Sequence, residues 1–328
     1  MVDKEFVKKV RDYGKIFSEL REEMANIVVG QSTIVDALLR AIIANGHALL
    51  EGVPGIAKTL MIRTLSSVTK CSFKRIQFTP DLLPTDIVGI TAYDEKKGFY
   101  IVKGPIFANF ILADEINRAP PKVQSALLEA MQEKQVTIGK ETFDLEHPFF
   151  VFATQNPLES MGTYPLPEAQ MDRFLFKIYV DYPTVEDEQE ILMKNMTLKR
   201  FTEYKLKPLL SPQAINILQK DVQNIYLDEK IEKYIVHIID ATRHPDKYKL
   251  KLAKYIEWGS SPRASIGLFI ASKAEAMLKG KEFVTPQHIK EIAHDTLRHR
   301  IILNYEGQAE GIKTDDVITE ILSRIPVP

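Results

Sequence analysis

Hydrophobic side chains recur at helical spacing through roughly the first forty-five residues. One run places apolar residues at every third or fourth position of residues 6–20, and a second run covers residues 34–44. Both patterns predict amphipathic helices. Residues 26–31 break the periodicity between them, and Ser32 stands where a side-chain cap for the second helix is expected.

Five short apolar runs follow, and each is bounded by polar or turn-forming residues. Helical patterns such as residues 122–133 lie between them. Buried strands that alternate with helices are typical of a parallel sheet covered by helices on both faces, so we predict an α/β fold. The predicted strands are residues 47–51, 75–78, 110–113, 149–153 and 174–180.

Two further segments, residues 90–102 and 136–145, alternate apolar and polar residues around a polar turn. This alternation predicts two-stranded hairpins. Neither hairpin is needed to complete the sheet. We therefore expect both to project from it and to be available for contacts with another molecule.

The pattern changes after residue 183. From Val185 onward it is almost entirely helical, and four polar residues followed by proline mark expected helix starts. We therefore predict an α/β domain over residues 1–183 and a helical domain over residues 184–328. The four pairs are Ser211-Pro212, His244-Pro245, Ser261-Pro262 and Thr285-Pro286.

Composition narrows the class of protein. Of 328 residues, 45% are hydrophobic and 27% are charged, as in a globular chain of two domains. No apolar run reaches the roughly 18–20 residues of a membrane span, and the N-terminus lacks the apolar stretch of a secretory signal. The net charge of −1 does not favour nucleic acid, and Cys71 is a single cysteine that cannot form an internal disulfide. We expect a cytoplasmic protein without membrane insertion.

A candidate phosphate-binding loop follows the first predicted strand and opens a helix. Backbone N–H groups in such a loop face phosphate oxygens, Lys58 would reach the β- and γ-phosphates of ATP, and Thr59 would supply a hydroxyl to Mg²⁺. Ala57 stands where glycine is usual, which should hinder close approach without preventing binding. The alternative is an ordinary strand–turn–helix junction. The loop residues are Gly52, Val53, Pro54, Gly55, Ile56, Ala57, Lys58, Thr59 and Leu60.

A second candidate group ends the strand predicted at residues 110–113, where Asp114 and Glu115 follow one another. Ligands of open α/β sheets bind beside the carboxyl ends of the strands. Asp114 would contribute to the Mg²⁺ shell, and Glu115 could act as the general base for an attacking water. The alternative is a solvated strand terminus.

Together these motifs and several longer strings resemble the MoxR family of AAA+ ATPases, over about residues 24–328. The resemblance implies a P-loop NTPase sheet flanked by helices, the AAA+ core, followed by an all-α helical lid domain. The strings between residues 78 and 174 are more specific than the phosphate loop and the acidic pair. The matching strings are residues 52–59, 78–84, 114–120, 153–157, 168–174 and 259–263.

The resemblance also assigns roles to residues whose spacing alone is uninformative. Asn156 matches sensor 1, Arg173 the arginine finger and Arg263 sensor 2, which could close on the nucleotide. Without the resemblance, spacing alone favours Asn156 as a turn residue before Pro157. Arg173 could then equally be a surface partner of its neighbour Asp172. Val29 and Gly30 lie in the segment that lines adenine in this family, whereas the role of Arg118 stays open.

By resemblance, the function is Mg²⁺-dependent ATP hydrolysis in a homo-oligomeric, hexameric ring, with Glu115 acting in cis and Arg173 in trans. The ring would remodel a protein client, for example one with a von Willebrand factor A domain, through hairpins that face its pore. Three alternatives stay open: a chelatase-type motor subunit for metal insertion, a switch that binds ATP without hydrolysing it, and a DNA-remodelling motor, which the net charge disfavours.

Overall fold

The computed structural model describes residues 4–53, 55, 57–96, 98–157, 162–194 and 201–328. Helices α1 (Lys4–Ala25) and α2 (Ser32–Ile43) confirm the two N-terminal helical patterns. The prediction that Ser32 caps α2 was wrong. Gln31 occupies the cap position, and its amide instead donates to the carbonyl oxygen of Asp181 at 3.2 Å, so a distant segment and not the helix end takes this side chain.

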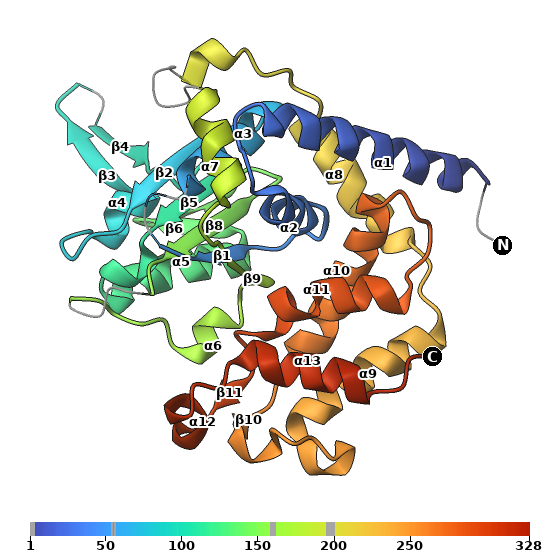
Figure 1. The fold of residues 1–328 in the computed structure, drawn as a ribbon. Coiled ribbons are helices and arrows are strands. Elements are labelled where there is room, and N and C mark those ends of the chain that lie inside the picture. The colour runs from blue at the N-terminus through green and yellow to red at the C-terminus, as the bar shows by residue number, and fades with distance from the viewer. Residues whose placement is uncertain (1–3, 54, 56, 97, 158–161, 195–200) are drawn as a thin grey trace.

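A five-stranded sheet forms the centre of the N-terminal part (Figure 1). Its order is β2-β5-β8-β1-β9 and all pairings are parallel, as the separation of apolar runs by helices predicted. The sheet order differs from the chain order, so strands far apart in sequence lie side by side. The strands are β1 (Ala48–Glu51), β2 (Phe73–Gln77), β5 (Phe110–Asp114), β8 (Phe150–Gln155) and β9 (Phe176–Tyr179).

Alternation along each strand produces two hydrophobic layers. Phe110 and Leu112 pack in the same cluster as helices α1, α2 and α3 (Lys58–Val68), whereas Ile111 and Ala113 pack with α4 (Pro84–Val88) and α5 (Pro121–Glu133). Both faces of the sheet are therefore covered, which is why the central strands β1, β5 and β8 are continuous apolar runs rather than alternating ones.

Both predicted hairpins form, and each is a two-stranded antiparallel sheet of its own. One pairs β3 (Gly89–Asp94) with β4 (Gly98–Lys103), and the other pairs β6 (Gln135–Ile138) with β7 (Glu141–Asp144). The β3–β4 hairpin extends outward from the sheet, at the left of Figure 1.

The C-terminal part is helical, and the four polar–proline pairs each precede a helix as predicted. A short ribbon of β10 (Ile256–Trp258) and β11 (Ile302–Leu303) is added to the predicted all-α pattern. The elements here are α7 (Val185–Met193), η2 (Phe201–Tyr204), α8 (Pro212–Asp221), η3 (Val222–Asn224), α9 (Glu229–Arg243), η4 (Pro245–Tyr248), η5 (Ala253–Tyr255), α10 (Pro262–Leu278), α11 (Pro286–Leu297), α12 (Tyr305–Ala309) and α13 (Thr314–Arg324).

The helical part docks against the sheet through strand β9 and helix α2. Helix α10 packs on α2, and α11 packs on β9. The guanidinium of Arg298 donates to the carbonyl oxygen of Lys177 at 2.7 Å, and the ring of His299 donates to that of Phe174 at 3.0 Å. Within the described ranges, no helix combines the length and the apolar character needed to cross a membrane.

Candidate active site

Three neighbouring strands bring the predicted phosphate loop, acidic pair and sensor 1 together. The loop follows β1, the acidic pair ends β5, and Asn156 follows β8, which lies between them in the sheet. Parallel strands end at the same edge, so the three segments share one pocket of about 440 Å³. The pocket is lined by Gly55, Ala57, Lys58, Thr59, Leu60, Arg75, Asp114, Glu115, Thr154 and Asn156.

The phosphate loop lies between β1 and the start of α3. Lys58 is the first residue of α3, and its ammonium donates to the carbonyl oxygen of Gly52 at 2.5 Å. Burial lowers the pKa of Lys58, and the carboxylates of Asp114, Glu115 and Glu51 partly offset that effect. Val53 packs against the core, and Pro54 and Ile56 lie outside the described residues.

Ala57, the departure from the usual glycine, adopts a left-handed backbone with φ 60° and ψ 20°. Glycine takes this conformation without steric cost, whereas alanine incurs about 1 kcal/mol. Gly55 has φ +86°, and a side chain there would meet open space. Two of the described loop residues thus have positive φ, which turns the backbone tightly ahead of α3.

The carboxylate of Asp114 is held from two sides. Its Oδ1 accepts the hydroxyl of Thr154 at 2.6 Å, and its Oδ2 accepts the Nε and a terminal nitrogen of Arg75 at 2.9 and 2.5 Å. The backbone N–H of Glu115 donates to the same Thr154 hydroxyl at 2.8 Å. Thr154 therefore sets the position of both acidic residues.

The carboxylate of Glu115 accepts two side-chain donors at Oε2, from Gln77 at 2.7 Å and Arg118 at 2.9 Å. The role of Arg118 was left open by the sequence. This contact places it at the predicted general base. The sequence patterns gave no role to Arg75, Gln77 or Thr154. Arg75 and Gln77 share one face of β2, and only the pairing of β2 with β5 brings them to the acidic pair.

Val29 and Gly30, predicted to line adenine, lie in a second pocket of about 540 Å³ that the start of α7 also lines. Gly30 has φ +72°, and a side chain there would lie 2.3 Å from Cγ of Asp187. Asp187 accepts the backbone N–H and the hydroxyl of Thr184 at 3.1 and 2.8 Å, which caps α7 beside this segment.

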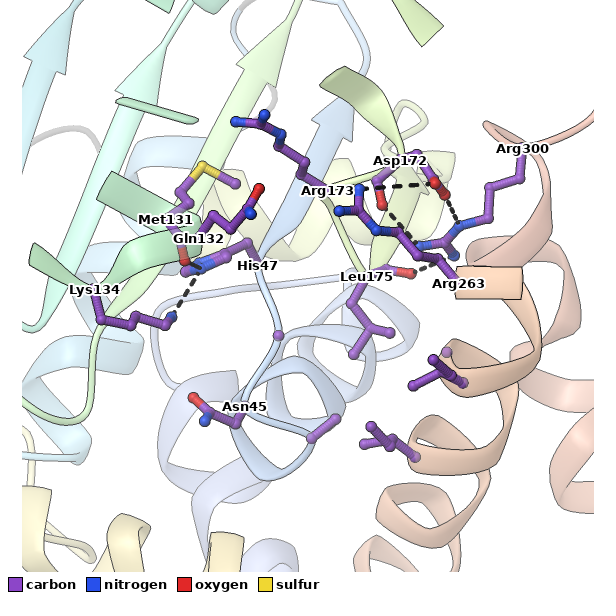
Figure 2. Close-up of a pocket in the computed structure, with 15 residues that line it drawn as sticks. Asn45, His47, Met131, Gln132, Lys134, Asp172, Arg173, Leu175, Arg263 and Arg300 are labelled. Carbon is purple, nitrogen blue, oxygen red and sulfur yellow. Dashed lines mark hydrogen bonds and ion pairs between the residues drawn. The ribbon is translucent and has the colours of Figure 1, made fainter. Parts of the chain in front are cut away.

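Arg173 and Arg263 lie elsewhere, in a third pocket of about 270 Å³ (Figure 2). Arg173 precedes β9, and the pocket also contains His47, which precedes β1, so it lies at the amino-terminal edge of the parallel strands. The phosphate loop lies at the opposite, carboxyl-terminal edge. Neither arginine lines the pocket of that loop. The structure thus brings these two residues together and separates them from the other predicted site residues.

The same third pocket contains buried His47 beside partly buried Lys134. Nδ1 of His47 accepts the N–H of Val151 at 2.9 Å, so Nε2 carries the proton and faces Nζ of Lys134 at 3.0 Å and the carbonyl oxygen of Met131 at 3.2 Å. Burial, helped by the Lys134 charge, holds the pKa of His47 well below its usual range. Burial also lowers the pKa of Lys134 from 10.5 to about 8.

Replacing Lys134 with methionine is expected to change the pH dependence of stability. Near pH 7 the folded chain partly buries a charge that the unfolded chain leaves in water, so Lys134→Met should raise the free energy of unfolding. The difference in free energy of unfolding between Lys134→Met and wild type should fall by about 2 kcal/mol from pH 7 to pH 10, because Lys134 is neutral in the folded chain at pH 10. Denaturant unfolding of both proteins at several pH values measures this difference, and Lys140→Met, at an exposed lysine, is the control. A difference that does not vary with pH would contradict the prediction.

Comparison with known proteins gives matches over both parts of the chain. The family described as "ATPase family associated with various cellular activities (AAA)" matches residues 47–176, and the AAA lid domain matches residues 251–321. Chaperone MoxR1 of Mycobacterium tuberculosis is 46% identical over 93% of this chain and 81% of the relative. Protein MoxR of Paracoccus denitrificans is 30% identical over 97% of this chain and 98% of the relative.

A solved structure agrees with these matches. The crystal structure of a candidate ATPase from Cytophaga hutchinsonii superposes with a TM-score of 0.92 at 48% identity, and the match covers 98% of this chain and 97% of the other. The predicted fold class, a parallel sheet flanked by helices and followed by a helical lid, is confirmed.

Proposed function

Because this chain belongs to the MoxR family of AAA+ ATPases, we propose that it hydrolyses ATP with Mg²⁺ and uses the energy to remodel a protein partner. Residues 1–183 would form the nucleotide-binding domain and residues 184–328 the lid. One observation carries the mechanism: the predicted catalytic groups form two sets at opposite edges of one sheet.

The pocket of the phosphate loop has the chemistry that ATP and Mg²⁺ require. The ammonium of Lys58 and the N-terminus of α3 favour phosphate anions, and the open space beside Gly55 permits close approach of the backbone. Hard oxygen ligands suit Mg²⁺, and the Thr59 hydroxyl and Asp114 carboxylate line this pocket. Mg²⁺ held there would neutralise charge on the β- and γ-phosphates.

Glu115 is the proposed general base. Gln77 and Arg118 fix its Oε2 by hydrogen bonds, so the carboxylate is oriented before a water molecule arrives. Glu115 would accept the proton of that water, and the Asn156 amide would orient it toward the γ-phosphate. The test is Mg²⁺-dependent release of inorganic phosphate from ATP, with Glu115→Gln as the inactive control.

Arg173 and Arg263 would act on the nucleotide of a neighbouring chain. A strand of four residues such as β1 spans about 13 Å, so a chain cannot bring groups from the amino edge of its sheet to phosphates at the carboxyl edge. Head-to-tail packing of identical chains, which closes into a ring, would deliver them. The proposed assembly is hexameric. For Arg263, the proposal makes the expectation specific: the nucleotide on which it closes is that of the neighbouring chain.

The β3–β4 hairpin is the proposed client contact. Tyr93 and Phe99 are 65% and 78% exposed, and their rings lie 5.2 Å apart, centroid to centroid. A cluster of exposed aromatic side chains on a projecting element is typical of a binding surface. Two aromatic rings side by side could contact the apolar residues of an unfolded client.

Replacing Tyr93 and Phe99 together with serine is expected to weaken client binding by at least about tenfold without changing basal ATP hydrolysis. The rings are exposed, so the fold should not depend on them. Binding of labelled casein, an unfolded protein, in the presence of ATP measures the effect. Tyr305→Ser, 87% exposed on the lid, is the matched control. Wild-type casein binding by the double variant would contradict this role.

A further inference from the structure

The carboxylate of Asp172, the residue before Arg173, contacts three residues of the lid. Figure 2 shows two of them, Arg300 and Arg263. Its Oδ1 accepts Nε of Arg300 at 2.7 Å, and its Oδ2 accepts the hydroxyl of Ser261 at 2.8 Å. A guanidinium nitrogen of Arg263 lies 3.9 Å from the same Oδ2. One carboxylate therefore joins the loop before β9 to the start of α10 and to the segment after α11.

The two lid arginines beside Asp172 differ in burial. The side chain of Arg300 is only 3% exposed, and its guanidinium also donates to the carbonyl oxygens of Phe174 at 2.8 Å and Leu175 at 3.2 Å. The side chain of Arg263 is 50% exposed. A buried, fully hydrogen-bonded guanidinium cannot turn toward a ligand without leaving polar groups unpaired, whereas an exposed one at 3.9 Å can. Arg300 thus anchors Asp172, and Arg263 stays available.

We propose that Asp172 is a positioning residue that holds Arg173 of the core and Arg263 of the lid as one pair, so that a chain presents both guanidinium groups together to its neighbour's nucleotide. This inference rests on the proposed function. Arginine side chains have many rotamers, and anchoring the two backbone segments that carry them reduces the entropy lost when both contact one phosphate group.

A positioning role and a purely structural role predict different results in mixed rings. If Asp172 only stabilises docking of the lid, its loss should lower the rate of ATP hydrolysis whether the altered chain donates the phosphate loop or the arginines. If it positions the two arginines, its loss should matter only in the chain that donates them. The chain that donates the phosphate loop and Glu115 should tolerate the change.

The experiment mixes two inactive chains, Arg173→Ala and Glu115→Gln. Some interfaces then combine the phosphate loop and Glu115 of the first chain with the arginines of the second, so ATP hydrolysis is expected to return. Adding Asp172→Asn to the Glu115→Gln chain should lower the restored rate at least about tenfold. Adding it to the Arg173→Ala chain should leave the restored rate within about twofold.

Equal losses in both placements, or no loss in either, would overturn the positioning role while the proposed function stands. No restoration in the starting mixture would overturn the proposed function, and this inference with it. If Asp172→Asn does not fold, Ser261→Ala removes one hydrogen bond to Asp172 and keeps the Arg300 pair. It should show the same asymmetry with a smaller loss, and a symmetric result would overturn the proposal. Ser211→Ala, which removes the cap of α8, controls for the lost cap of α10.

Discussion

A chain carrying Glu115→Gln is expected to lose ATP hydrolysis by about 10²–10⁴-fold while it still binds ATP. Glutamine has nearly the shape of glutamate, and its amide oxygen can still accept the hydrogen bonds of Gln77 and Arg118. It cannot accept a proton from water at neutral pH. The loss should therefore fall on the chemical step and not on the pocket. Phosphate release and equilibrium binding of a fluorescent ATP analogue separate the two.

The matched control for this variant is Glu129→Gln, an exposed glutamate on helix α5, which should hydrolyse ATP at the wild-type rate. A Glu115→Gln rate within tenfold of wild type would exclude Glu115 as the base. A loss of ATP binding as large as the loss of hydrolysis would instead mean that this carboxylate shapes the nucleotide pocket.

Arg173→Ala is expected to lower hydrolysis by about 10³–10⁵-fold, the contribution of an arginine finger to phosphoryl transfer. ATP affinity at the altered chain's own phosphate loop should change little, because Arg173 lies outside that pocket. Arg173→Lys should recover only part of the rate, since lysine lacks the planar fork of guanidinium donors. Single-turnover hydrolysis and nucleotide titration measure these two quantities.

Arg11→Ala, on the exposed face of α1, controls for the loss of one positive charge. An unchanged rate for Arg173→Ala would contradict the role. So would weaker ATP binding that accounts for the whole effect, because that result would place Arg173 beside the nucleotide of its own chain.

Much of the fold could be predicted because it depends on local patterns. Alternating polar residues mark the hairpins, continuous apolar runs mark the buried strands, and the serine–proline pairs at 211 and 261 mark helix starts. Part of the candidate site could also be predicted from the sequence. Once the sheet is taken as parallel, the segments after β1, β5 and β8 must meet at one edge.

The remainder depends on tertiary contacts that local patterns do not record. Arg75 and Gln77 reach the acidic pair because β2 pairs with β5, a neighbour that the chain order does not specify. Gln31, and not Ser32, occupies the cap position of α2, and its side chain makes no capping hydrogen bond but donates to the carbonyl oxygen of Asp181, far along the chain. The placement of Arg263 beside Arg173 depends on how the lid docks on β9, and the periodicity of α10 carries no information about that.

The central claim, that each active site is completed by two chains, is tested most directly by the specific ATPase rate as a function of protein concentration. Light scattering on the same samples gives the oligomeric state, and Glu115→Gln gives the background. If two chains complete each site, the specific rate is expected to lie near the background where the chains are monomers and to rise to a plateau as rings form. A Glu115-dependent rate that is equally high in monomers would contradict it.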